Sequence, residues 1–149
     1  MKNLRITAIV SALIGLTASA YLTWAKITHQ NVVCIEGMGD CNIVNSSSYA
    51  EWRGIPIALI GMIGYLLILA LLVLYKNGKS FNRLIPITLF CFTLFGAMYS
   101  FYLTYIEIFR IHALCQWCLI SALAMVYLFI TATVFISKSK LFESIHLEE

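Results

Sequence analysis

Charged residues are scarce in this sequence. Its 149 residues include ten Lys and Arg and seven Asp and Glu, so that 11% are charged while 61% are hydrophobic. Soluble domains carry about 25% charged residues, so a soluble globular protein is excluded. The chain also lacks internal repeats, low-complexity segments and any domain linker, which predicts a single domain over residues 1–149.

Four long stretches contain no charged residue at all. Each could cross about 30 Å of hydrocarbon as a helix, and lipid requires every backbone polar group to be paired within its own segment. The predicted fold class is therefore an all-α integral membrane protein, a four-helix transmembrane bundle. We expect helices at about 6–25, 55–75, 84–107 and 113–136, and an outer loop at 26–54.

Basic residues predict the orientation, because Lys and Arg beside a span tend to stay in the cytoplasm. With both termini inside, the inner side carries Lys2, Arg5, Lys76, Lys79, Arg83, Lys138 and Lys140, and the outer side only Lys26, Arg53 and Arg110. We expect both termini to be cytoplasmic and the first loop to be exported. Ala18-Ser19-Ala20 also permits a second interpretation, a cleaved signal peptide, and that interpretation exports the same loop.

Four of the five cysteines fall on the predicted outer side, where disulfides persist. Cys115-Gln116-Trp117-Cys118 is a CxxC pair at the outer end of the last predicted helix, and its spacing puts both thiols on one helix face. Unpaired N–H groups at a helix N-terminus favour negative charge and lower a thiol pKa. This pattern predicts a reactive thiolate, and hence a membrane thiol oxidoreductase.

The outer loop carries the second pair, Cys34 and Cys41. These residues could form a disulfide if the segment Gly37 to Gly39 folds back. Two dithiol pairs on one side can exchange electrons, provided that the loop reaches the helix end. Two alternatives stay open, namely inert structural disulfides and a zinc ion held by four thiolates, for which the Cys34 to Cys41 spacing is wide.

Other residues near these pairs have two interpretations each. Cys91, inside the third predicted helix, is expected to be a buried packing residue rather than a functional one. His112 is expected to be an interfacial polar residue, although its protonated form could stabilise the thiolate. An aromatic stripe could line a ring-shaped ligand, but helix packing or lipid contact explains it better; its members are Phe92, Phe95, Tyr99 and Tyr102.

Together these features resemble the vitamin K epoxide reductase family, specifically its bacterial members that reoxidise periplasmic disulfide-forming proteins. The resemblance rests on four helices, a cysteine pair in the first outer loop, the run Cys41 to Tyr49 followed by Gly54-Ile55-Pro56, and a CxxC that opens the last helix. DsbB-type oxidases catalyse the same net reaction but carry their CxxC in the first outer loop. The pattern therefore does not fit a DsbB-type protein.

The resemblance implies a role for each cysteine. Cys34 would meet the partner, Cys41 would exchange with Cys115, and Cys118 would face a quinone, either ubiquinone or menaquinone with vitamin K as the alternative. The implied partner is a separate thioredoxin-fold (DsbA-like) protein, in a membrane lipid environment and without nucleic acid or metal. Two further candidate quinone contacts are Ser47, which matches the family's loop serine near the quinone head, and Trp117.

The chain departs from the animal members of this family at two positions. Ala122 stands where they carry a tyrosine, and Ile57 where they carry an asparagine that also binds the vitamin K head. The predicted function is therefore thiol:quinone oxidation in support of disulfide formation, in a bacterial inner or plasma membrane with the site facing outward. The alternatives are a vitamin K quinone or epoxide reductase and, as a non-enzyme, a disulfide-stapled structural membrane protein.

Overall fold

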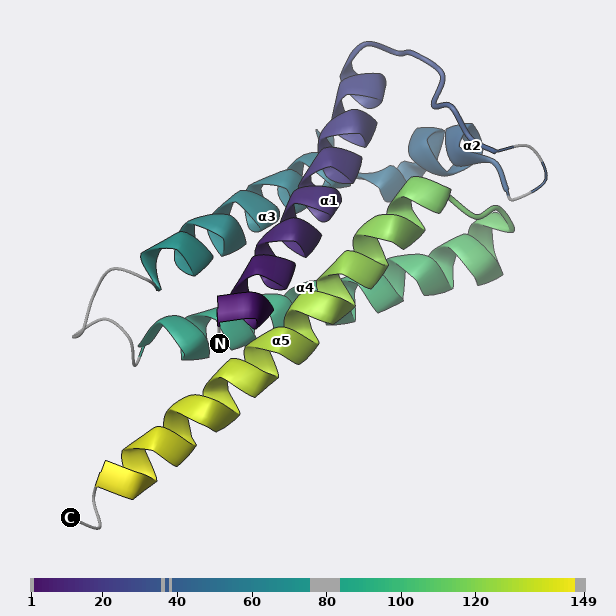
Figure 1. The fold of residues 1–149 in the computed structure, drawn as a ribbon. Coiled ribbons are helices and arrows are strands. Elements are labelled where there is room, and N and C mark those ends of the chain that lie inside the picture. The colour runs from purple at the N-terminus through teal and green to yellow at the C-terminus, as the bar shows by residue number, and fades with distance from the viewer. Residues whose placement is uncertain (1, 36, 38, 76–83, 147–149) are drawn as a thin grey trace.

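The structure is a computed structural model that describes residues 2–35, 37, 39–75 and 84–146. Helices dominate it, and one short antiparallel hairpin pairs Trp52 with Ile55. In chain order the elements are α1 (Lys2–Ile27), α2 (Cys41–Ser46), the 3₁₀ turn η1 (Ser48–Ala50), β1 (Glu51–Trp52), β2 (Ile55–Pro56), α3 (Ile57–Leu74), α4 (Leu84–Ile106), the π-helical turn η2 (Glu107–Ile111) and α5 (Gln116–His146), as Figure 1 shows.

Among the described residues, four helical segments are long and apolar enough to cross a membrane, which confirms the predicted all-α bundle. The bounds differ from the expected ones at the last helix. This helix starts at Gln116 instead of 113 and runs to His146 instead of 136. It continues because Lys, Leu and Glu are good helix formers and need not stop where the apolar stretch stops.

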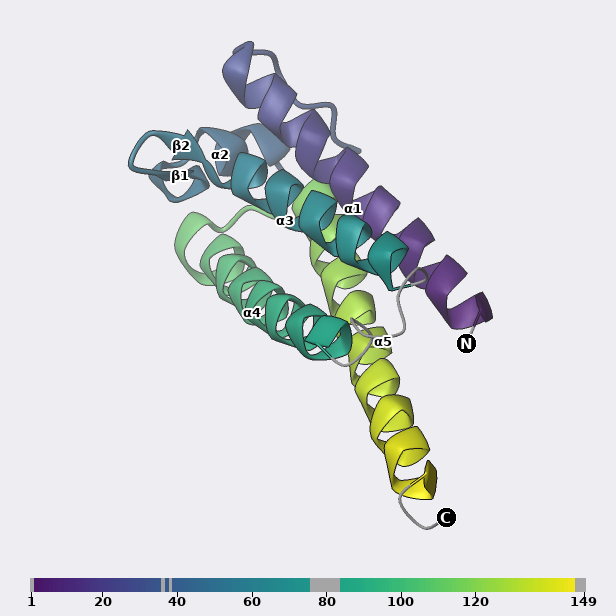
Figure 2. The ribbon, with the colours of Figure 1, turned by 90° about the vertical axis from the view of Figure 1, so that its left-hand side faces the viewer.

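Helix α1 lies at the centre of the packing and contacts both α3 and α5 extensively, while α5 also packs along α4. Ala8, Ala12 and Ala18 are buried on α1, and such small side chains let neighbouring helices approach closely in a membrane protein. Helices α3 and α4 touch each other much less, and their ribbons lie apart in Figure 2. A loosely packed seam therefore separates α3 from α4.

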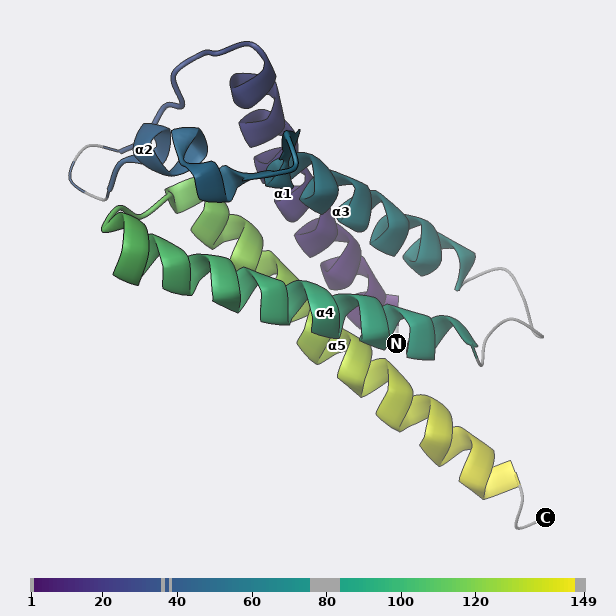
Figure 3. The ribbon, with the colours of Figure 1, turned by 180° about the vertical axis from the view of Figure 1, so that it is seen from behind.

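The short elements gather at one end of the bundle. Figures 1 and 3 show α2 and the start of α5 at this end and both described ends of the chain at the other. The connection from α3 to α4, with Lys76, Lys79 and Arg83, lies outside the described residues. The cysteine loop and the CxxC thus meet at the end opposite the termini, and the direction of this end across a membrane stays a prediction.

Two features fix the cysteine loop against the bundle. The Asp40 side chain caps α2 by accepting hydrogen bonds from the backbone N–H groups of Asn42 and Ile43. Gly37 and Gly39 both have positive φ, at 90° and 134°, which confirms the expected reversal at these residues. A Cβ atom at Gly39 would collide with the carbonyl oxygen of Leu114, so only glycine lets the loop lie this close to the CxxC.

Candidate active site

The four outer cysteines occupy two different redox states. Cys34 and Cys41 form a disulfide with a Cα–Cα distance of 6.1 Å, whereas Cys115 and Cys118 are free thiols. Cys34 is half-buried, while Cys41 and Cys115 are both 0% exposed. Because only Cys34 of the loop pair reaches the surface, an incoming thiolate would attack that sulfur.

The structure brings the loop pair and the helix pair together. Cys41 and Cys115 belong to one buried apolar cluster, and Cys34 and Cys118 pack against its edge. The cluster is completed by buried residues from α1, the loop, α2 and the turn before α5, namely Leu22, Ala25, Val32, Val44 and Ala113. All four cysteines of the predicted relay therefore lie in or against one buried cluster.

Side chains of α5 form hydrogen bonds with the loop segment that carries Cys34. The indole N–H of Trp117 donates to the Val33 carbonyl oxygen at 2.9 Å, and the Gln116 side chain accepts from the Ile35 N–H at 3.2 Å. Trp117 also packs against Tyr21, with ring centroids 4.9 Å apart. Trp117, a candidate quinone contact, therefore packs against α1 and donates a hydrogen bond to the loop.

The environment of Cys115 favours its thiolate. This residue immediately precedes α5, and the backbone N–H of Cys118 donates to its sulfur at 3.3 Å. A hydrogen bond from the Cys118 thiol is the largest cause that lowers the pKa of Cys115 below its ordinary value, and backbone N–H groups of Cys118 and Trp117 add to it, while burial opposes the shift. The expected activation at the start of this helix is therefore present at Cys115.

Glu107 is a site residue that the sequence interpretation missed. It is 5% exposed, and its Oε2 accepts a hydrogen bond from the backbone N–H of Cys115 at 3.0 Å. The carboxyl group also interacts with the Cys118 thiol. One signal could have revealed it, since an acidic residue that directly continues a long apolar stretch is expensive to bury and usually serves a function.

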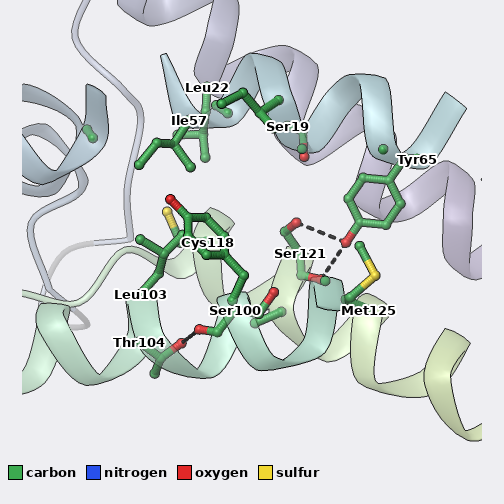
Figure 4. Close-up of a pocket in the computed structure, with 18 of the residues that line it drawn as sticks. Ser19, Leu22, Ile57, Tyr65, Ser100, Leu103, Thr104, Cys118, Ser121 and Met125 are labelled. Carbon is green, nitrogen blue, oxygen red and sulfur yellow. Dashed lines mark hydrogen bonds between the residues drawn. The ribbon is translucent and has the colours of Figure 1, made fainter. Parts of the chain in front are cut away.

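A cavity of about 340 Å³ lies in the seam between α3 and α4, next to Cys118. This volume falls within the range of small-molecule sites, about 300 to 1,000 Å³. Figure 4 shows Cys118 among cavity residues from α1, α3, α4 and α5. The wall is mostly apolar, and the polar residues that interrupt it are Ser19, Asn45, Ser47, Tyr49, Tyr65, Tyr99, Ser100, Thr104, Glu107, Cys118 and Ser121.

The polar groups of the cavity differ in what they can still bind. Ser47 lines the cavity as expected, but its hydroxyl group donates to the Val44 carbonyl oxygen at 2.7 Å. Tyr65 is engaged as well, through hydrogen bonds to the Ser121 carbonyl and hydroxyl groups (Figure 4). Within the described part of the chain, the Tyr99 hydroxyl and the Asn45 side-chain amide have no such bond, so they remain available to a ligand carbonyl.

The aromatic stripe and the two departures from the animal pattern also lie at this cavity. Phe92, Phe95 and Tyr99 line it, whereas Tyr102 does not. Ile57 and Ala122 line it too, so both positions present apolar surface where the animal members would present hydrogen-bonding groups. The stripe is therefore part of a cavity wall and not only a packing surface.

The structure contradicts the expectation for Cys91 and agrees with that for His112. Cys91 is exposed on α4 and is absent from the cavity lining, so the expectation of a buried packing residue is wrong. Its helix face points away from the other spans, and lipid accepts a small apolar side chain there. His112 has a left-handed backbone, with φ of 54°, and is exposed; no hydrogen bond to Cys115 occurs among the described residues.

The geometry defines a class of protein, a membrane-embedded thiol redox protein with two cysteine pairs beside a ligand cavity. The sequence profile of the Vitamin K epoxide reductase family matches residues 6–133. The chain therefore belongs to the vitamin K epoxide reductase family. Membership in this family agrees with the prediction of a membrane-embedded redox enzyme.

A curated relative supports the same class. The chain is 34% identical over 119 residues to "Thiol-disulfide oxidoreductase LTO1" of Arabidopsis thaliana, an alignment that covers 74% of this chain and 31% of that protein. The chain thus spans less than a third of the length of this relative. The family also implies a quinone-type electron acceptor in general.

Proposed function

We propose that this chain is a membrane thiol:quinone oxidoreductase that reoxidises an extracytoplasmic thioredoxin-fold partner and supports disulfide formation. One observation carries the proposal. Cys118 lines the α3–α4 cavity while its backbone N–H holds the sulfur of Cys115, which is buried in the same cluster as Cys41. These contacts support a path from the loop cysteines through Cys115 and Cys118 to a cavity of ligand size.

The proposed electron path has three steps. A reduced partner thiolate attacks Cys34, and a second partner thiol resolves the mixed disulfide, which leaves the loop as a dithiol and the partner oxidised. Cys41 then attacks Cys115 of an oxidised helix pair, so that the loop disulfide re-forms and Cys115 and Cys118 become thiols. The helix pair finally gives two electrons to the quinone, which becomes a quinol.

In this path, a loop disulfide beside two free helix thiols is the state in which the electrons have reached the inner pair and have not yet left it. Reduction of the quinone by Cys115 and Cys118 would then complete the cycle without further movement of the loop.

The surface around Cys34 supports a protein partner. Val33 is 73% exposed and Ile35 is 61% exposed, so apolar side chains flank the reactive disulfide on both sides. A thioredoxin-fold protein could cover these side chains as it brings its thiolate to Cys34. The compartment we propose is the outer face of a bacterial inner or plasma membrane, in agreement with the distribution of basic residues.

The test is quinone reduction by the full purified chain in lipid, with dithiothreitol or a reduced thioredoxin-fold protein as the electron donor. We expect the wild type to reduce ubiquinone or menaquinone and the variants Cys115→Ser and Cys118→Ser to be inactive. Cys91→Ser is the matched control and should keep the wild-type rate, because Cys91 is exposed and outside the cavity lining. Wild-type turnover by Cys118→Ser would refute the quinone assignment.

A parallel assay with vitamin K epoxide separates the alternative enzyme function. Ile57 and Ala122 offer no hydrogen bond to a vitamin K head, so we expect little or no epoxide reduction. Epoxide reduction at a rate comparable to quinone reduction would favour the alternative. A chain whose cysteines resist mild reductant and which reduces neither substrate would instead be a structural protein.

A further inference from the structure

Glu107 is a buried acidic residue at the membrane end of the active site. It opens the π-helical turn η2, a type of turn that is frequent at functional sites. Within residues 2–35, 37, 39–75 and 84–146 no Lys or Arg forms an ion pair with it, since the salt bridge found there joins Lys26 to Glu51. An isolated buried carboxylate is unfavourable, so its retention calls for an explanation beyond packing.

The contacts of Glu107 connect it to both thiols of the helix pair. Its Oε2 accepts the Cys115 N–H at 3.0 Å, and its carboxyl group interacts with the Cys118 thiol. Cys118 loses its proton when the two sulfur atoms join, and a carboxylate in contact with that thiol can receive the proton. Glu107 thus binds the backbone of one cysteine of the reacting pair and lines the same cavity as the other.

Glu107 also connects two cavities. It lines the α3–α4 cavity together with Cys118, and it lines a shallow outer groove together with Asp40 and His112. Among the described residues it is the only one that both linings share. Its side chain thus stands between a groove open to water and the space that a quinone would occupy.

We propose that the Glu107 carboxyl group relays protons between the outer groove, the Cys118 thiol and the quinone in the cavity. This inference rests on the proposed function, because it describes the quinone half-reaction. The groups around the relay are Cys115 and Cys118 on the α5 side, and Asp40 and His112 across the groove.

The chemistry balances as follows. The Cys118 thiol loses its proton to Glu107, the two sulfur atoms give two electrons to the quinone, and an S–S bond forms between Cys115 and Cys118. The quinone needs two protons to become a quinol. One comes from Cys118 through Glu107, and the second comes from water in the outer groove through the same carboxyl group, so the single negative charge of the thiolate is neutralised.

A structural role for Glu107 gives a different expectation. By accepting the Cys115 N–H it also caps the start of α5, and a glutamine could accept that hydrogen bond equally well. Glutamine cannot carry a proton. Glu107→Gln therefore separates the relay from the cap, while Glu107→Asp keeps an acid that lies one methylene further away.

The experiment measures the two half-reactions separately in the full chain. For the quinone half-reaction, fully reduced protein is mixed with ubiquinone and quinol formation is followed in a single turnover. We expect Glu107→Gln to slow this step by about a hundredfold or more, the usual contribution of acid–base catalysis, and Glu107→Asp to recover part of the rate. Reduction of Cys34–Cys41 by the partner should stay at the wild-type rate.

Glu51→Gln is the matched control, since Glu51 is an exposed carboxylate outside both cavity linings, and it should leave quinol formation unchanged. If Glu107→Gln forms quinol at the wild-type rate, the relay is overturned while the proposed function stands. If the wild type forms no quinol, the proposed function itself fails. Should Glu107→Gln not fold, the wild type decides, because quinol formation that is equally fast in H₂O and D₂O also overturns the relay.

Discussion

The two ends of the proposed electron path are built in different ways. Around the cysteine loop, backbone groups of Val32, Val33 and Ile35 are fixed by hydrogen bonds to side chains of α1, α2 and α5. At the α3–α4 seam the wall is mostly apolar, and the two helices pack loosely. Disulfide exchange requires three sulfur atoms in line, whereas a quinone site needs space and a few polar contacts, so rigidity is concentrated where geometry limits the chemistry.

The largest expected effect comes from lifting the loop off the CxxC. Gly39→Ala introduces both a strained positive φ and a collision with the Leu114 carbonyl group, which together disfavour the docked loop by about 1 to 3 kcal/mol. We expect exchange between the two cysteine pairs to slow by about fivefold or more. Quinol formation from a pre-reduced helix pair should stay close to the wild-type rate.

The matched control is Gly37→Ala, which carries positive φ but meets no atom within 4 Å. It isolates the strain from the collision, so it should slow exchange less than Gly39→Ala. Equal effects of the two variants, measured by rapid mixing and thiol trapping, would mean that the contact between loop and Leu114 does not control exchange.

The next effect concerns the cavity side. A Cβ at Gly15 would collide with the ring of Tyr65, whose hydroxyl is tied to Ser121, so Gly15→Ala should push this ring into the cavity. We expect a destabilisation of about 1 to 3 kcal/mol and a higher KM for the quinone, with disulfide exchange unchanged. Thermal unfolding and quinone titration measure these quantities.

Gly64→Ala on α3 provides the comparison for Gly15→Ala. Its added Cβ would meet nothing within 4 Å, so it should reduce stability less than Gly15→Ala does, and because Gly64 lines the cavity it measures how an added methyl group in the wall alone changes KM. A normal KM in Gly15→Ala, with the expected loss of stability, would show that Tyr65 does not bound the ligand space.

A smaller effect is expected when one hydrogen bond of the loop is removed. Trp117→Phe keeps an aromatic ring beside Tyr21 but loses the bond to Val33, worth about 1 kcal/mol. Backbone amides near Cys34 should then exchange with solvent about fivefold faster. Trp24→Phe replaces an exposed indole and should leave that exchange unchanged. Amide protection in Trp117→Phe equal to that of the wild type would show that the Trp117–Val33 hydrogen bond does not stabilise the loop.

The smallest effect is a shift in ionisation. The Cys118 thiol is the main hydrogen-bond donor that lowers the pKa of Cys115, so Cys118→Ala should raise that pKa towards its ordinary value. The thiolate of Cys115 would then form at a higher pH in Cys118→Ala than in the wild type. Ultraviolet absorbance of the thiolate during a pH titration measures the change, and an unchanged midpoint would assign the shift to the backbone N–H groups instead.

The sequence alone predicted the spans and the cysteine pairs because their signals are local. Charge-free stretches indicate membrane helices directly, and the CxxC lies at the start of its helix as expected. The sequence did not predict which individual side chains face lipid and which face a neighbouring helix. Lipid is as apolar as a helix interface, so hydrophobicity did not reveal that Cys91 is exposed.

Contacts between segments that are distant in the chain could not be predicted from the sequence either. Trp117 and Val33 are far apart in the chain, and nothing local indicates that the indole donates a hydrogen bond to the loop. Glu107 was hidden by its place at the edge of an apolar stretch, and its hydrogen bond to Cys115 depends on the π-helical turn between them.

The loose seam between α3 and α4 determines how a ligand would reach the cavity. Ile63, Leu67 and Phe95 line the cavity and are exposed at the surface of the bundle, so the mouth of the cavity opens sideways between two spans. A lipid-soluble ligand would arrive by diffusion in the plane of the bilayer, where partition has already raised its local concentration. Occupancy can then be high even if the site binds each molecule weakly, which also allows the product to leave quickly.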